Sequence, residues 1–154
     1  MPVYYLESSS LVKKYVAEIG TSWIIGLFRQ NKPMPFYVAR ITHVEVLSAL
    51  YRRKRIGSLT EQQLDKAVKR FERDFYKKLF KIEIEKAITN KASELVKNYP
   101  LRAYDAVQLA AALTANDERI SIGASAITFV SADNDLNKAA SAEGLQVENP
   151  NSYP

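Results

Sequence analysis

Apolar and polar residues along the chain form short hydrophobic runs that are separated by longer segments with helical spacing. Five runs indicate strands, at 3–6, 36–41, 80–84, 126–132 and 145–148. At least one segment with helical periodicity lies between each strand and the next. This order predicts a three-layer α/β fold, in which helices flank a largely parallel sheet.

Capping and turn residues set the bounds of the expected helices. A first helix begins at one of the serines 8–10 and runs to about Val16, and a second begins at Thr21 or Ser22 and stops before NKPMP at 31–35. Capping-box spacing at Thr42–Glu45 and at Thr60–Gln63 predicts two further helix starts. The helices that begin at these two positions are expected to span 42–55 and 60–79. Further helices are expected at 85–98, 103–115 and 135–143.

The length of the chain predicts one domain. Its 154 residues show no internal repeat or linker, so we expect residues 1–150 to form a single domain and 151–154 a short tail. The final segment NPNSYP is too polar and proline-rich to be expected to extend the fold. Because the chain has no signal-like start and no run of about 18 apolar residues, we expect a cytoplasmic protein without a membrane anchor.

The composition excludes several kinds of site. With no cysteine and a single histidine, His43, the chain cannot build a disulfide framework, an iron–sulfur cluster, a thiolate zinc site or a multi-histidine metal centre. Any bound metal must therefore be held mainly by oxygen atoms. A lone histidine at a helix start is more often a capping or surface group than a general base.

Charge is unevenly distributed around a net value of +5. Residues 51–100 hold 14 basic and 7 acidic side chains, whereas residues 101–154 hold 3 basic and 7 acidic ones. A basic middle beside an acidic last third suggests a surface for a polyanion near a cluster of carboxylates. Ordinary solvated helix faces would give the same pattern, so charge alone does not decide between the two interpretations.

Four acids occupy positions that converge in a parallel sheet. Glu7 follows the first strand, Asp133 follows the fourth, and Glu45 and Asp105 lie in the first turns of helices. Ligand sites of such sheets gather at the carboxyl ends of the strands. Grouped carboxylates repel one another, a divalent cation relieves that repulsion, and an all-oxygen set favours Mg²⁺ or Mn²⁺. Acids with such ions suit hydrolysis of phosphodiesters.

Each acid also has a simpler explanation. Glu45 fits the capping partner of Thr42, and Asp105 fits a residue that offsets a helix dipole. Asp133 or Asp135 fits a helix cap, and Glu7 fits a solvated loop residue. The neighbouring sequence argues against these explanations for Glu45 and Asp105, because both precede apolar runs of helices that should be largely buried, where an unpaired carboxylate is costly.

Basic and aromatic residues could form a rim that binds the backbone and unpaired bases of a nucleic acid. The candidates nearer the acids are Lys13, Lys14, Arg40 and Arg102, with Arg52 and further cations at 53–55 and 66–78. Tyr5, Tyr15, Tyr51 and Tyr104 could stack on unpaired bases, but we expect at least half of them to pack in the core. The aromatic helices at 21–30 and 64–80 could present an apolar groove to a partner, or pack within the domain or a homodimer.

Four segments together resemble the successive motifs of PIN-domain ribonucleases, specifically VapC-type toxins: YYLESSSLVKKYVAEIGT, ITHVEVLSALYRR, LRAYDAVQLAAAL and FVSADNDLNKAA. The resemblance covers nearly the whole chain. It implies a PIN fold and an endoribonuclease that depends on Mg²⁺ or Mn²⁺. The acid quartet of the family falls on Glu7, Glu45, Asp105 and Asp133.

Further positions follow from the same resemblance. Asp135 matches a further acid present in many members, so the implied metal ligands are Glu7, Asp105, Asp133 and Asp135, and Ser9 matches the small hydroxyl residue after the first acid. The resemblance also implies a cognate antitoxin protein that binds and inhibits the toxin, and a homodimer. The RNA that would be cleaved is not readable from the sequence.

One departure separates two hypotheses. The first acid of the family is ordinarily Asp, and Glu7 adds a methylene group, a displacement of about 1 Å that can cost on the order of 10²-fold in rate. The chain is therefore either an active nuclease, which we favour, or an RNA-binding or antitoxin-binding module with weakened catalysis. A phosphoacceptor receiver domain fits poorly, because a single acid follows the first strand and the late strands lack a terminal lysine.

Overall fold

The computed structural model describes residues 2–30 and 36–154 of the chain, and the segment 31–35, where the sequence predicts a break, lies outside the described residues. Within them a sheet has the order β3-β2-β1-β4-β5, and every neighbouring pair is parallel. Its strands are β1 (Val3–Leu6), β2 (Phe36–Ala39), β3 (Leu79–Ile82), β4 (Ile127–Val130) and β5 (Gln146–Glu148). The predicted α/β fold with a largely parallel sheet is confirmed.

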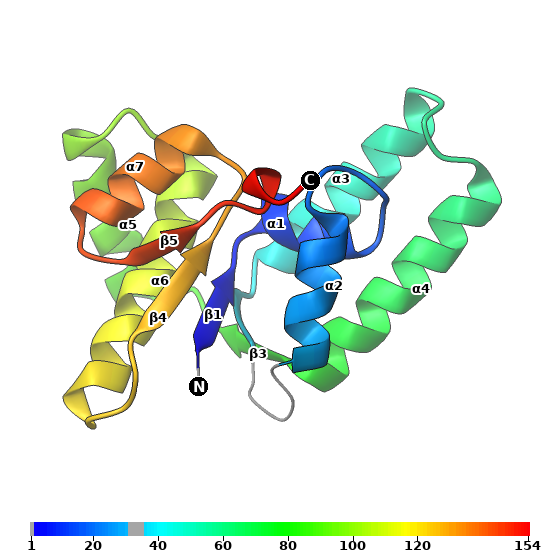
Figure 1. Ribbon diagram of the computed structural model, residues 1–154. Helices are drawn as coiled ribbons and strands as arrows, with labels where there is room; N and C mark the ends of the chain where they lie inside the picture. Colours follow the sequence, from blue (N-terminus) through cyan, green and yellow to red (C-terminus); the bar gives the residue numbers. More distant parts are fainter. Residues whose placement is uncertain (1, 31–35) are drawn as a thin grey trace.

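Helices cover both faces of the sheet (Figure 1). One side carries α1 (Ser8–Leu11) with the 3₁₀ turn η1 (Val12–Lys14), α2 (Thr21–Gln30), α3 (Thr42–Arg55) and α4 (Glu61–Lys78). The other side carries α5 (Lys86–Asn98), α6 (Ala103–Ser121) and α7 (Asn134–Ala142). Figure 1 shows α3 and α4 reaching away from the sheet as a helical pair.

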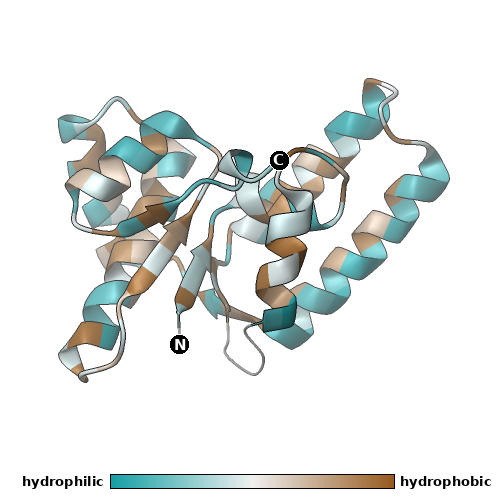
Figure 2. Cartoon of the chain, in the orientation of Figure 1, coloured by the Kyte–Doolittle hydropathy of each residue, from teal (hydrophilic) through white to brown (hydrophobic). Residues whose placement is uncertain are grey.

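Alternation along the strands builds a core on each face. Val3 and Tyr5 of β1 pack with α5, α6 and α7, whereas Leu6 packs with α1, α2, α3 and α4. In α4 the buried positions Leu64, Phe71 and Phe75 lie on one side, and the helix is hydrophilic along most of its length in Figure 2. The solvent-facing surface of α4 is consequently polar, as its amphipathic spacing predicts.

Several element bounds differ from the sequence prediction. The helix expected at 103–115 continues to Ser121, because the mostly polar segment 117–121 prolongs it over the surface. Asn116 accepts a hydrogen bond from the Ile127 amide of β4 at 2.8 Å. The first helix is shorter than expected and tightens into η1 after Leu11. Its N-cap is Glu7 rather than one of the serines, because the Glu7 carboxylate accepts a hydrogen bond from the Ser9 amide.

The two predicted capping boxes have opposite outcomes. Thr60 and Gln63 form one at the start of α4, with both reciprocal hydrogen bonds present. The prediction for Thr42 and Glu45 is wrong, because the N-cap of α3 is Ile41 and no side chain caps it. The side chains of Thr42 and Glu45 instead contact other elements.

The C-terminal segment takes part in the fold, contrary to the expectation from its composition. Pro150–Ser152 forms a 3₁₀ turn, η2, and the ring of Tyr153 stacks on Trp23 of α2 with centroids 4.6 Å apart. Gly20, at a φ of 87°, lets the chain pass against Pro150, whose carbonyl oxygen would lie 2.4 Å from a Cβ at that position. Among the described residues, no helix has the length and apolar character that crossing a membrane requires.

Candidate active site

The carboxyl edge of the central strands gathers the four predicted acids. Glu7 directly follows β1, and its amide donates to the Val130 carbonyl at the end of β4 at 3.0 Å. Asp133 follows β4, while Glu45 and Asp105 lie in the first turns of α3 and α6. A pocket of about 540 Å³ opens here between α3, α6 and the β4–α7 turn. Its lining includes Glu45, Asp105, Asp133 and the predicted cations Arg52 and Arg102.

Glu7 lies beneath this edge and is only 4% exposed. Its Oε2 atom accepts hydrogen bonds from the Ser9 amide and the Ser131 hydroxyl, both at 3.0 Å, and from the Ser9 hydroxyl. Burial raises the pKa of Glu7 to about 7, with the nearby charge of Glu45 adding to the rise and the serine hydrogen bonds opposing it. The solvated-loop explanation of Glu7 is therefore wrong.

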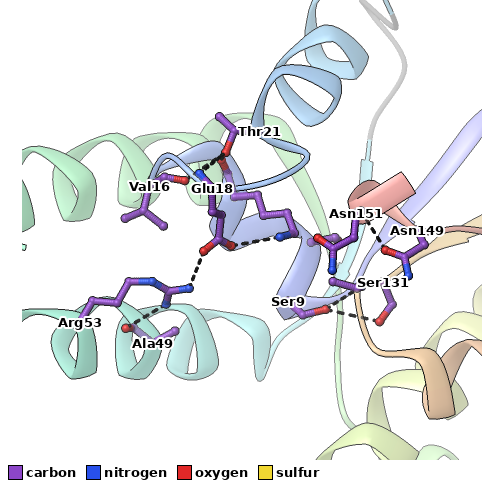
Figure 3. A network of polar contacts seen from close by, with 12 residues as sticks. Ser9, Val16, Glu18, Thr21, Ala49, Arg53, Ser131, Asn149 and Asn151 are labelled. Carbon is purple, nitrogen blue, oxygen red and sulfur yellow. Dashed lines mark hydrogen bonds and ion pairs between the residues drawn. The ribbon is translucent and has the colours of Figure 1, made fainter. Parts of the chain in front are cut away.

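Two serines connect Glu7 with the β4–α7 turn. The hydroxyl of Ser131 also accepts a hydrogen bond from the Asp133 amide at 3.1 Å, and the Ser9 hydroxyl accepts one from the Ala132 amide at 3.0 Å. Figure 3 shows the two hydroxyls facing each other, with their oxygens 3.4 Å apart. Ser131 was not singled out from the sequence, although it is the polar residue that ends an apolar strand.

The side chain of Glu45 forms hydrogen bonds with residues of other elements and does not cap its own helix. Its Oε1 atom accepts hydrogen bonds from the Ser8 hydroxyl at 3.0 Å and from the Gln108 side-chain amide at 2.6 Å. Both donors belong to other elements, α1 and α6. The capping explanation of Glu45 is excluded by this geometry.

Asp105 and Asp133 both line the pocket. Burial raises the pKa of Asp105, the charges of Asp133 and Glu45 raise it further, and only Arg102 acts in the opposite direction. Asp133 caps α7 by accepting a hydrogen bond from the Leu136 amide at 3.1 Å, so its predicted capping role is real. Asp135 is exposed in the first turn of α7 and does not line the pocket.

The five predicted RNA contacts divide into two groups. Arg52 and Arg102 are exposed and line the pocket. Lys13 is buried and pairs with Glu18, which also binds Arg53 of α3 (Figure 3). Lys14 pairs with the buried Asp74, and Arg40 pairs with Glu83 on the surface.

The aromatic and histidine candidates also separate by burial. Tyr5 and Tyr15 are buried in the two cores, whereas Tyr51 and Tyr104 are 45% and 66% exposed, so the expectation that at least half pack in the core is confirmed. His43 places its Nε2 atom 2.9 Å from the Glu72 carboxylate of α4 and lies against Phe75. Its contacts join α3 to α4.

The donor set at the edge fits a hard divalent cation, because all the converging ligands are carboxylate oxygens and the charge of Glu45 contributes to the raised pKa of both Glu7 and Asp105. Over residues 2–30 and 36–154, no three Asp, Glu or His side chains stand close enough to hold one ion together. Mg²⁺ in nucleotide-processing sites is usually held by one or two carboxylates with water and substrate phosphates. A pair such as Asp105 with Asp133 is sufficient for that kind of binding.

Two curated ribonucleases of Mycobacterium tuberculosis, VapC45 and VapC49, resemble this chain. Each is 32% identical to it over 117 residues, which is 76% of this chain and 79% of the relative. The chain belongs to the VapC ribonuclease family. A scan against family models found no match.

Several solved structures share the fold of this chain. VapC20 of M. tuberculosis, described as a toxin that cleaves the sarcin–ricin loop, superposes with a TM-score of 0.62 over 93% of this chain and 95% of its own, at 13% identity. VapBC2 of Rickettsia felis, bound to a fragment of its promoter DNA, gives 0.62 over 96% and 98%, at 16% identity. FitAcB of Neisseria gonorrhoeae gives 0.66 over 96% and 97%, at 12% identity. These similarities confirm the PIN fold.

Proposed function

We propose that this VapC-family chain is a Mg²⁺- or Mn²⁺-dependent endoribonuclease that acts as the toxin of a toxin–antitoxin pair. The observation that carries the proposal is the meeting of Glu7, Glu45, Asp105 and Asp133 at one sheet edge beside a pocket that also holds two arginines. Family membership supports it, because the curated relatives are named ribonucleases.

The residues of the chain have distinct roles in this proposal. Asp105, Asp133 and Glu45 line the pocket and offer carboxylates that would hold the cation, and Glu7 is buried close to Glu45. A bound Mg²⁺ or Mn²⁺ would supply positive charge that lowers the pKa of an attacking water and steadies the leaving oxygen. Asp135, exposed in the first turn of α7, is a further candidate ligand.

RNA is held by the rim of the pocket. Arg52 from α3 and Arg102 before α6 lie on the pocket wall together with the exposed ring of Tyr104. The guanidinium groups suit backbone phosphates, and an exposed tyrosine suits an unpaired base. Lys13, Lys14 and Arg40 already pair with acids of the chain, so we assign them a smaller contribution to RNA affinity than Arg52 and Arg102.

The partner is proposed to be a cognate antitoxin protein, with a homodimer as the assembled form of the toxin. Solved structures with this fold include a toxin–antitoxin complex from Klebsiella pneumoniae and the VapBC2 complex. Sedimentation of the purified chain, alone and after co-expression with the product of an adjacent small gene, tests both parts. A monomer that captures no such partner would contradict them.

The activity is tested by incubating labelled single-stranded and structured RNAs with the purified chain in Mn²⁺, Mg²⁺ or EDTA. We expect cleavage with either metal, no cleavage in EDTA, and loss of cleavage in Asp105→Asn with RNA affinity retained. Asp117→Asn is the matched control, because Asp117 lies on the same helix but is exposed at its far end. Equal cleavage by the parent and Asp105→Asn would overturn the proposed mechanism.

Glu7→Asp separates an active enzyme from a weakened binding module. If the additional methylene of Glu7 limits the rate, the aspartate variant cleaves faster, by up to about 10²-fold. If the parent and Glu7→Asp are both folded and inert on every RNA, the nuclease proposal fails and the binding-module hypothesis replaces it.

A further inference from the structure

Gln108 is the polar residue at the centre of the carboxyl edge. It lies in α6 one turn after Asp105, and its side chain is fully buried. Its Nε2 atom lies 2.6 Å from Glu45 Oε1, 2.9 Å from the Thr42 hydroxyl and 3.1 Å from the Ser8 hydroxyl. Its Oε1 atom accepts a hydrogen bond of 2.6 Å from the hydroxyl of Tyr5, which is itself fully buried in β1.

The surrounding groups fix the orientation of this amide. A carboxylate such as Glu45 only accepts hydrogen bonds, so the amide nitrogen must face it. The other end of the amide then presents its oxygen to Tyr5, whose hydroxyl donates. Exchanging the nitrogen and oxygen would place two acceptors against each other at 2.6 Å.

This cluster joins elements that are far apart in the sequence. Gln108 connects β1 through Tyr5 with α3 through Glu45, and the separations along the chain are 103 and 63 residues. The neighbouring residues of α6 are buried alanines and leucines of the core. A buried amide must keep all its partners to avoid a desolvation cost, and apolar residues in place of both Gln108 and those partners would serve stability alone at least as well.

We propose that Gln108 is a positioning residue that holds the Glu45 carboxylate toward the pocket, and that Tyr5 holds Gln108. The proposal rests on the proposed function, since it assigns a role to a contact of Glu45. Hydrogen-bond partners of metal-site carboxylates fix their orientation, and their loss costs about 10- to 100-fold in metal affinity or activity. Glu45 presents its Oε1 atom to Gln108 and Ser8, and the same residue lines the pocket.

The experiment compares Gln108→Met with Gln108→Glu in the full-length chain. Methionine keeps the volume and removes every hydrogen bond, whereas glutamate keeps the shape and the acceptor for Tyr5 but opposes Glu45 with a second carboxylate. We expect both to lower kcat by about 10- to 100-fold, with KM within about 3-fold of the parent, and to weaken Mn²⁺ binding, measured by water proton relaxation without RNA, by a similar factor. Tyr5→Phe should have a smaller effect in the same direction.

Asn116→Leu is the matched control for a purely structural role. Asn116 is a buried amide two turns further along α6, and it bonds to the Ile127 amide away from the pocket. We expect this variant to lower the melting temperature and to leave both kcat and Mn²⁺ affinity unchanged. If Gln108→Met behaves in the same way, Gln108 is only structural and the proposal is overturned.

A double variant shows whether Gln108 acts through Glu45. In a Glu45→Gln background, adding Gln108→Met should lower kcat by a further factor of less than about 2, because the contact that it removes no longer positions a carboxylate. Additive losses would contradict the proposal. If the parent cleaves no RNA, the proposed function fails by itself, and unchanged Mn²⁺ affinity in Gln108→Met would then separately overturn the role of Gln108.

Discussion

Glu7 and Asp74 are both buried carboxylates, and their surroundings shift their pKa values in opposite directions. Glu7 has hydroxyl and amide donors and another carboxylate nearby, and burial raises its pKa to about 7. Burial alone would raise the pKa of Asp74 as well, but the hydrogen bond and charge of Lys14 and hydrogen bonds from Lys78 and Tyr15 outweigh it and hold the pKa below the ordinary value.

The partners explain the contrast. Asp74 has Lys14 Nζ at 2.5 Å, the Tyr15 hydroxyl at 3.0 Å and Lys78 Nζ at 3.1 Å. These cations compensate the charge of Asp74, and the contact with Lys14 joins α4 to η1. Within residues 2–30 and 36–154, no cation is among the hydrogen-bond partners of Glu7, which suits a site that acquires positive charge from outside. The role of a buried acid therefore depends on what neutralises its charge, not on its burial.

The largest expected effect is on stability at Asp74. Asp74→Ala leaves the largely buried Lys14 without its partner, and removing one member of a buried ion pair typically costs about 3–5 kcal/mol. Urea unfolding at neutral pH measures the loss. A cost below about 1 kcal/mol, the range of exposed pairs, would show that the pair contributes no more than a surface contact.

The pH dependence of stability should differ in sign between the two acids. The pKa of Glu7 is raised from 4.5 to about 7 in the fold, so the protonated form is favoured and stability is lost as pH rises through that window, by roughly 3 kcal/mol in all. For Asp74 the folded pKa is lowered, so its contribution is present above the unfolded value of 3.8 and is lost as pH falls.

Thermal unfolding in EDTA from pH 4.5 to 8 tests this difference. Glu7→Gln should remove most of the decline between pH 4.5 and 7, because glutamine keeps an acceptor for Ser9 and Ser131 without a charge. Asp74→Asn should leave that decline intact. An unchanged decline in Glu7→Gln would show that another group is responsible.

Activity should respond to Glu7 and not to Asp74. We expect Glu7→Gln to reduce RNA cleavage by about 10²-fold, equivalent to about 2.7 kcal/mol of barrier, because it removes a charge at the proposed metal edge. Asp74→Asn, assayed at a temperature where circular dichroism shows it folded, should stay within about 3-fold of the parent. Similar losses of cleavage in both variants would contradict a functional role for Glu7 and a structural role for Asp74.

The smallest effect on stability is expected for Lys78, one of the cations that contact Asp74. Lys78 has a side chain that is 45% exposed, whereas that of Lys14 is 10% exposed. Lys78→Met should therefore cost less than about 1 kcal/mol in urea unfolding. Lys14→Met should cost clearly more, and the reverse order would mean that Lys78 is the principal partner of Asp74.

Much of the fold could be predicted from local patterns, and the exceptions have identifiable causes. The strands at 3–6 and 36–41 and the capping box at Thr60 depend on neighbouring residues, so spacing predicted them. The same spacing at Thr42 was misleading, because Thr42 and Glu45 find better partners on Gln108 and Ser8. Tyr153 joins the fold only because Trp23, 130 positions earlier, offers a ring to stack on.

The acids of the candidate site could be predicted from the sequence, but the residues that form hydrogen bonds with them could not. Each of the four acids stands just after a strand or at a helix start, and a parallel sheet brings such positions to one edge. Gln108 and Ser131 carried one weak signal each, a single polar residue within or at the end of an apolar run. Lys14 was expected to contact RNA, since no local pattern indicates that Asp74 lies beside it.

Composition and periodicities of a few residues are enough to predict the order of strands and helices, the absence of cysteine ligands and the placement of acids at element ends. Which acids are neutralised depends on the folded arrangement. A pKa depends on burial and on charges within a few ångströms, and decisive neighbours come from far along the chain, as with Lys14 for Asp74, 60 residues away, and Ser131 for Glu7, 124 residues away.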